Sequence, residues 1–224
     1  MLDTSILQQV TEIFRNLEAD YTFRISLSPL REEASGLIEF LNDFATTSPR
    51  LSVEKHEAEG DALSFTLLKN GEETGVTFRG IPNGHEFTSL LLAVLNADGK
   101  GKNLPDEGIT RRIRALKGDI RLQTYVSLTC TNCPDVVQTL NIFALLNPCI
   151  HHEMVDGALF QAEVDAKGVQ AVPSVFANGN LLHVGRGSLG ELLEKLEAVF
   201  PSSSEAENNE NAPFHRTFDV LVLG

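Results

Sequence analysis

The feature of this 224-residue sequence that most constrains its fold is an internal repeat. The stretch Ile25-Ser-Leu-Ser recurs as Val126-Ser-Leu-Thr, and the hairpin signal Asn70-Gly71 recurs as Asn178-Gly179. Between these markers, apolar residues follow helix and strand spacing in the same order in both halves. We therefore predict two tandem copies of one α/β unit, with a period of about a hundred residues.

In each half the expected order is helix, strand, helix, strand, a hairpin of two strands and a last helix. This order resembles the thioredoxin fold, so we predict two tandem thioredoxin-like folds, each with a mixed central sheet flanked by helices. The first fold is placed at residues 1–103 and the second at residues 104–200. The first half lacks redox cysteines and also lacks the middle helix expected in the second. Helical spacing marks seven segments: 3–18, 29–45, 85–95, 106–116, 134–146, 158–167 and 189–199.

Composition and charge exclude several classes of protein. The net charge of −13 argues against sequence-independent nucleic-acid binding and against binding to anionic membranes. The N-terminus shows no secretory signal, and no apolar run approaches the length of a membrane span. Three cysteines, two of them in a Cys-x-x-Cys, fit a reducing compartment better than a framework of structural disulfides. We therefore expect a cytoplasmic protein with no nucleic-acid or membrane partner.

The motif that carries chemistry is Cys130-Thr-Asn-Cys133, which lies between a strand-like run and an amphipathic helix. In this context the spacing is typical of a redox-active dithiol. We expect Cys130 near the helix N-cap, where unpaired N–H groups and the helix dipole stabilise a thiolate. Pro134 suits the first turn, because its missing N–H has no partner there. Cys130 is therefore predicted to attack a target disulfide and Cys133 to resolve the mixed disulfide.

The composition changes abruptly after Phe200. Residues 201–213 hold several acids and no large apolar side chain, which predicts a flexible linker. Residues 214–224 end in Asp219-Val-Leu-Val-Leu-Gly224, which is typical of the first strand of a dinucleotide-binding unit. We therefore expect the chain to be a fragment that stops at the start of an FAD-binding domain.

Together these features resemble the N-terminal domain of the flavoprotein subunit of bacterial alkyl hydroperoxide reductase. The resemblance covers the whole chain, and the order of the motifs is more specific than any one of them. The motifs are Gly84 to Leu90, Tyr125 to Val137, Val172-Pro173, Phe176-x-Asn178-Gly179, the acidic linker and the final Asp219 to Gly224. One departure is Thr131, where the family usually has a histidine, and the residues between the cysteines tune the redox potential.

The resemblance implies a place in an electron relay. In that family the domain takes electrons from a C-terminal module that uses FAD and NADH (or NADPH), and the full-length protein is expected to be a homodimer. It passes the electrons to a separate peroxiredoxin subunit, which reduces peroxides. The flexible linker lets the domain move between the flavin module and this partner. No cofactor is expected to bind to the residues present here.

The resemblance also implies roles for residues outside the Cys-x-x-Cys. Val172-Pro173 should form a cis peptide bond beside the dithiol, with the Val172 backbone contacting partner peptides. From position alone, Glu86 is a carboxylate in the first turn of a helix, stabilised by the helix dipole. The resemblance implies instead a buried acid from the first half with a raised pKa, acting as a base toward Cys133. Both interpretations of Glu86 stay open at this point.

Two other interpretations of the dithiol remain. One is a general thioredoxin-like or glutaredoxin-like protein disulfide reductase. The other is a metal-binding or scaffold module in which Cys130 and Cys133 form half of a four-ligand zinc site, completed from Cys149, His151 and His152. The spacing to a second ligand pair is wrong for zinc, so we expect no metal. Cys149, after a proline at a helix end, is expected to be a bystander thiol.

Overall fold

The computed structural model of the chain describes residues 2–28, 31–57 and 62–201. The predicted linker beyond residue 201 and the predicted dinucleotide-binding strand ending at Gly224 lie outside the described residues, and both stay predictions. Most of the segment between Glu57 and Leu63, where the first half was expected to lack a helix, also lies outside them. The proposed boundary at residue 103 falls in the connector between two helices and stays a prediction as well.

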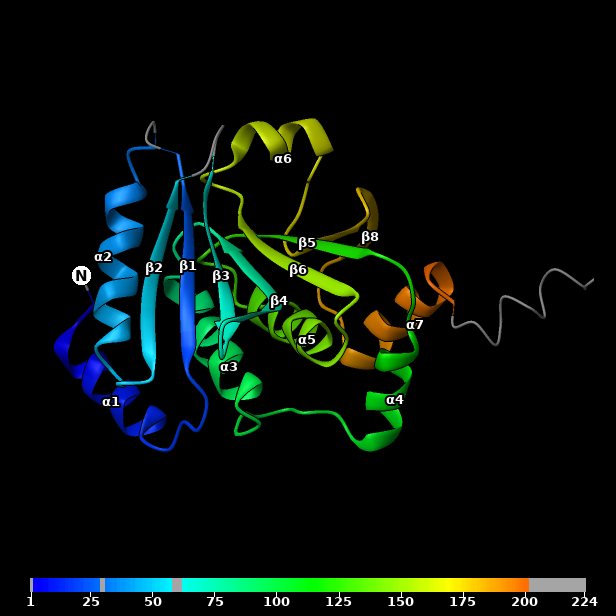
Figure 1. Cartoon of the computed structure of the whole chain (residues 1–224). Coiled ribbons are helices and arrows are strands. Elements are labelled where there is room, and N and C mark those ends of the chain that lie inside the picture. The colour runs from blue at the N-terminus through cyan, green and yellow to red at the C-terminus, as the bar shows by residue number, and fades with distance from the viewer. Residues whose placement is uncertain (1, 29–30, 58–61, 202–224) are drawn as a thin grey trace, which may run out of the picture.

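A single mixed sheet runs through both halves (Figure 1). Its strand order is β2-β1-β3-β4-β6-β5-β7-β8. The strands are β1 (Tyr21–Leu27), β2 (Leu51–Glu57), β3 (Leu63–Lys69), β4 (Glu72–Arg79), β5 (Ile120–Val126), β6 (Ile150–Asp156), β7 (Ser174–Ala177) and β8 (Asn180–Val184). Both Asn-Gly turns are confirmed: in each, the asparagine and the glycine have positive φ, as a two-residue hairpin requires.

The expectation of a separate sheet in each half is wrong. Strand β4 of the first half pairs in parallel with β6 of the second, from Val76 opposite His152 to Arg79 opposite Val155. This pairing satisfies backbone N–H and C=O groups that each four-stranded group would otherwise leave unpaired. The two sheets have therefore merged into one.

The helices largely match the expected segments. They are α1 (Thr4–Phe14), α2 (Ala34–Ala45), the 3₁₀ turn η1 (Gly84–Glu86), α3 (Phe87–Ala97), α4 (Glu107–Ala115), α5 (Cys133–Leu146), α6 (Gln161–Lys167) and α7 (Leu189–Val199). Several starts follow local capping: Asp3 accepts from the Ser5 N–H at 2.8 Å, and Ser188 forms a capping box with Glu191.

Three helices begin later than their sequence pattern predicts. Helix α2 begins at Ala34 because Arg31 to Glu33 form a turn, closed by the Ala34 N–H donating to the Arg31 carbonyl at 3.2 Å. Helix α6 begins at Gln161 because Phe160, with φ −122° and ψ 43°, is not helical. The helix expected from His85 opens with η1, and α3 proper starts at Phe87. Apolar spacing thus continues through turns that the backbone does not wind into an α-helix.

Helices α5 and α6 lie on opposite faces of the sheet. Successive side chains of a strand alternate between faces. On β5, Thr124 points to the α5 side, where it meets His152, whereas the Tyr125 hydroxyl donates to Glu163 on α6. On the first of these faces α5 packs against α3, α4, β4, β5 and β6 (Figure 1). The helix that carries Cys133 therefore touches both halves of the molecule.

Side chains reinforce the junction of the halves on the α6 face. The Phe160 ring of the second half lies beneath two guanidinium groups of the first, those of Arg31 at 4.7 Å and Arg79 at 4.2 Å from its centroid. Arg79 also forms an ion pair with Glu163 at 2.8 Å. Because these contacts join strand ends and helices of both halves, they oppose any rotation of one half against the other.

The core of the first half is built on Phe44. Its ring is fully buried and contacts four other aromatic rings, with centroid separations of 5.6 to 6.4 Å: Phe14, Phe23, Phe40 and Phe87. Edge-to-face pairs of this kind add to the stabilisation from burial itself. Phe44 thereby links α1, α2, β1 and α3.

We expect Phe44→Ala to lower the free energy of unfolding by about 3–5 kcal/mol, because it leaves a cavity between four rings. Denaturation in urea measures the change. Val199→Ala, on a helix end that is 54% exposed, is the matched control and should change the free energy by less than about 0.5 kcal/mol. A similar small effect for both variants would contradict the central place of Phe44.

Candidate dithiol site

Cys130 and Cys133 form a disulfide at the start of α5, with their Cα atoms 5.6 Å apart. Cys130 is half-buried and Cys133 is fully buried. The more accessible sulfur is thus the first one, as expected for an attacking thiol followed by a resolving one. Pro134 lies in the first turn of the helix, as predicted.

The expected position of Cys130 near the helix N-cap needs correction. Asn132 is the N-cap residue and Cys133 is the first helical residue. Cys130 lies before the cap because its N–H donates to the Ser127 carbonyl at 2.9 Å, which closes a turn between the strand and the helix. Its bond to Cys133 keeps the Cys130 sulfur at the positive end of the helix.

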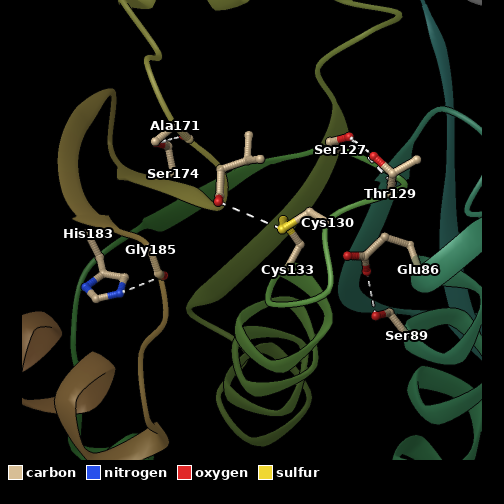
Figure 2. Close-up of a disulfide and its surroundings, with 11 residues drawn as sticks. Glu86, Ser89, Ser127, Thr129, Cys130, Cys133, Ala171, Ser174, His183 and Gly185 are labelled. Carbon is tan, nitrogen blue, oxygen red and sulfur yellow. Dashed lines mark hydrogen bonds between the residues drawn. A yellow bond between two sulfur atoms is a disulfide. The ribbon is translucent and has the colours of Figure 1, made fainter.

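The cis peptide bond predicted between Val172 and Pro173 is confirmed, and it lies beside the dithiol. The Val172 carbonyl oxygen is 3.8 Å from the Cys130 Sγ, as Figure 2 shows by a dashed line. The surrounding loop is fixed on both sides, since Ser174 donates to the Ala171 carbonyl at 2.6 Å and the Gly185 N–H donates to the Pro173 carbonyl at 2.8 Å. A backbone segment with set geometry therefore borders the exposed sulfur.

Glu86 reaches the site from the first half. It is fully buried at the end of η1, which packs against α5, and Figure 2 shows its carboxylate pointing toward the disulfide. The Ser89 hydroxyl donates to Oε2 at 2.6 Å, whereas Oε1 has no hydrogen-bond partner among the described residues. Burial raises the pKa of Glu86 to about 7, and the bond from Ser89 opposes part of this rise. The dipole-stabilised surface carboxylate, one of the two interpretations from sequence, is therefore excluded.

The zinc interpretation has no support in the described part of the chain. His152 is fully buried, with Nε2 2.8 Å from the Thr124 hydroxyl and Nδ1 2.7 Å from the Asn141 side-chain oxygen, so both ring nitrogens already have partners. Burial lowers the pKa of His152 to about 3, so the ring is neutral. Cys149 is a half-buried free thiol, and no three metal-ligating side chains cluster among the described residues.

Sequence reasoning missed two parts of this environment. One is the buried Thr124, His152 and Asn141 network beneath the dithiol helix; a histidine in a strand of apolar alternation was the available signal. The other is Gly84, whose φ of 57° lies in the left-handed region. The sequence shows Gly84 close to Glu86 but gives no indication of what it approaches.

A half-buried cysteine, a buried partner at a helix start and an adjacent cis-proline define a thioredoxin-like dithiol–disulfide oxidoreductase. Residues 120–198 match the family described as Thioredoxin domain. This match covers the dithiol, the cis-proline and the last helix. The predicted thioredoxin-like α/β fold and redox-active disulfide are thereby confirmed.

Relatives place the chain more closely. It is 38% identical over 224 residues to a protein named NADH dehydrogenase in Bacillus subtilis (strain 168), and 39% identical over 224 residues to the alkyl hydroperoxide reductase protein AhpF of Staphylococcus aureus (strain N315). All of this chain is covered in both cases, but only 42% of each relative. The chain thus spans about two fifths of the length of these curated relatives.

A solved structure gives the family. The crystal structure of the NTD_N/C domain of alkyl hydroperoxide reductase AhpF from Enterococcus faecalis (V583) superposes with a TM-score of 0.79 at 31% identity. The match covers 88% of this chain and 100% of that one. The chain therefore belongs to the AhpF family of alkyl hydroperoxide reductase flavoproteins and corresponds to its N-terminal domain, as the sequence motifs predicted. In the part of the chain that the structure describes, no helix has the length and apolar character to cross a membrane.

Glu86 should make stability depend on pH in the oxidised protein, where the cysteines do not titrate. Its pKa is raised from 4.5 to about 7 on folding, so its contribution is fully present below pH 4.5 and is lost as the pH rises through about 7. Over that window the free energy of unfolding should fall by about 1.4 kcal/mol per pH unit. Glu86→Gln should abolish this slope in denaturant titrations. Ser89→Ala should extend it to higher pH, and a slope unchanged in both variants would contradict the buried acid.

His152 should act with the opposite sign. Its pKa falls from 6.5 to about 3 on folding, so its contribution is present above pH 6.5 and is lost as the pH falls toward about 3, at about 1.4 kcal/mol per pH unit. His152→Gln should flatten the acid limb of the stability profile, while Gln retains groups able to bond Thr124 and Asn141. An acid limb as steep as that of the parent would show that the ring is already protonated in the folded state.

Proposed function

We propose that this chain relays electrons from a flavin module to a peroxiredoxin disulfide by dithiol–disulfide exchange. The observation that carries the proposal is the pairing of a half-buried Cys130, bordered by the Val172 carbonyl, with a fully buried Cys133. Family membership supports the kind of partner. Residues 1–103 and 104–200 serve as two thioredoxin-like units, of which only the second carries the dithiol.

The exchange takes place in two steps at named atoms. The reduced Cys130 thiolate attacks one sulfur of the partner disulfide, forms an intermolecular disulfide and releases the other partner sulfur as a thiolate. Cys133 then loses its proton and attacks the Cys130 Sγ, so the intramolecular disulfide forms and the second partner thiolate leaves. Two electrons pass from this domain to the partner, and burial of Cys133 keeps outside reagents from competing with the second step.

Glu86 is the proton acceptor for Cys133 in this proposal. Its carboxylate comes from the first half, points toward the disulfide (Figure 2) and has one oxygen with no partner among the described residues. A pKa of about 7 lets it exchange a proton near neutral pH. The partner segment that bears the target disulfide lies along the Val172 backbone, next to Pro173.

The electron source lies outside the described residues. Names of relatives support this: one is called NADH dehydrogenase, and this chain covers only 42% of its length. We assign FAD and NADH (or NADPH) to the remaining part of a longer, homodimeric protein, and cytoplasm as its location. The Cys130–Cys133 disulfide is the group that the flavin module reduces.

The relay is tested by mixing the chemically reduced chain with an oxidised peroxiredoxin subunit of alkyl hydroperoxide reductase in a stopped-flow instrument. Cys130→Ser should abolish transfer, and Cys133→Ser should accumulate a mixed disulfide with the partner, visible on a non-reducing gel. Cys149→Ser is the matched control, because Cys149 lies beyond the far end of α5 from the dithiol, and it should react like the parent.

Two results would contradict the relay. Transfer by Cys130→Ser at the parental rate would exclude the dithiol as the donor. Reduction of insulin disulfides as fast as the peroxiredoxin disulfide would instead support a general protein disulfide reductase.

A further inference from the structure

The two halves make a backbone contact at the turn that precedes Cys130. Gly84, in the first half, lies against the carbonyl group of Leu128 in the second. A Cβ atom added to Gly84 would lie 2.5 Å from the Leu128 oxygen and 3.4 Å from its carbonyl carbon. Both neighbours are backbone atoms, so no side-chain rotation relieves the overlap. Only glycine permits this approach.

The same contact is fixed by a hydrogen bond. The His85 N–H donates to the Leu128 carbonyl at 3.1 Å. Leu128 lies within the turn that the Cys130 N–H closes on Ser127 at 2.9 Å. The backbone next to Glu86 is therefore bonded to the backbone of the turn that holds Cys130.

The loop that leads to Gly84 is held at its other end too. Gly80 follows β4 with φ 114°, and a Cβ atom there would lie 2.9 Å from the Cβ of Asp156 at the end of β6. The Gly80 N–H also donates to the Leu63 carbonyl at 2.9 Å. Residues 80–84 thus span from the junction of β4 and β6 to the Leu128 contact, and both of their ends are close-packed.

We propose that Gly84 is a positioning residue for dithiol exchange: its missing side chain lets the first half set the Glu86 carboxyl against the disulfide. This inference rests on the proposed function, because it acts through Glu86. A larger residue at position 84 pushes η1 away from Leu128 and moves Glu86 with it, since both belong to the same three-residue turn. The cysteines themselves keep their place at the start of α5.

The test follows exchange with a small aromatic disulfide, which needs no protein partner. Cys130 releases the first chromophoric thiol, and attack by Cys133 releases the second. The rate of the second release should show an inflection near pH 7 in the parent, from Glu86, and Glu86→Gln should remove it. Gly84→Ala is expected to remove it as well. Combining the two substitutions should slow the reaction no further than Glu86→Gln alone, because both act on one group.

The matched control is Gly168→Ala. Gly168 has nearly the same backbone, with φ 64° against 57°, but nothing lies within 4 Å of its added Cβ atom. It should match the backbone strain of Gly84→Ala and keep the inflection. If Gly84→Ala does not fold, as judged by thermal melting, Gly84→Asn replaces it, because asparagine tolerates the left-handed region and still carries a Cβ atom.

The outcomes separate the two proposals. Loss of the inflection in Gly84→Ala or Gly84→Asn, but not in Gly168→Ala, supports the positioning role. An inflection retained by the Gly84 variants and lost in Glu86→Gln overturns that role and leaves Glu86 as the proton acceptor. An inflection retained by Glu86→Gln overturns both assignments, while the relay through Cys130 and Cys133 is judged separately by transfer to the peroxiredoxin.

Discussion

The parallel pairing of β4 with β6 is the interaction on which the rest of the structure depends. It joins two four-stranded groups into one sheet and brings α3 of the first half against α5 of the second. The loop after β4 then runs to α3 past the end of β6 and the turn at Leu128. Glu86 arrives at the dithiol because of this route. The side-chain clamp on Phe160 holds the same junction from the other face.

Features set by local chemistry were predictable from the sequence. The Cys130 and Cys133 spacing, the cis bond before Pro173 and the Asn-Gly turns depend on a few adjacent residues, whose backbone preferences are strong. The order of elements followed from apolar periodicity. Features set by distant contacts were not predictable. The merging of the sheets needs two strands more than seventy positions apart to meet, and neither strand carries a signal for the other.

Errors at the site have the same origin. The start of α5 was misplaced because the Cys130 N–H bonds to Ser127, and nothing in the apolar pattern marks that turn. Glu86 left two interpretations open because its burial comes from α5, which lies in the other half. Gly84 was unremarkable in the sequence, since a glycine before a helix has several explanations. Its close approach to Leu128 emerges only when both halves are assembled.

The shared sheet also explains why a copy without redox cysteines persists. Taken alone, the second half would present β6 as a bare edge with unpaired N–H and C=O groups, and α5 would lose the apolar cover of α3. Such an edge recruits strands from other molecules and begins aggregation. The first half caps it permanently. Its retention is therefore a matter of keeping the dithiol half monodisperse, even before any contribution to electron transfer.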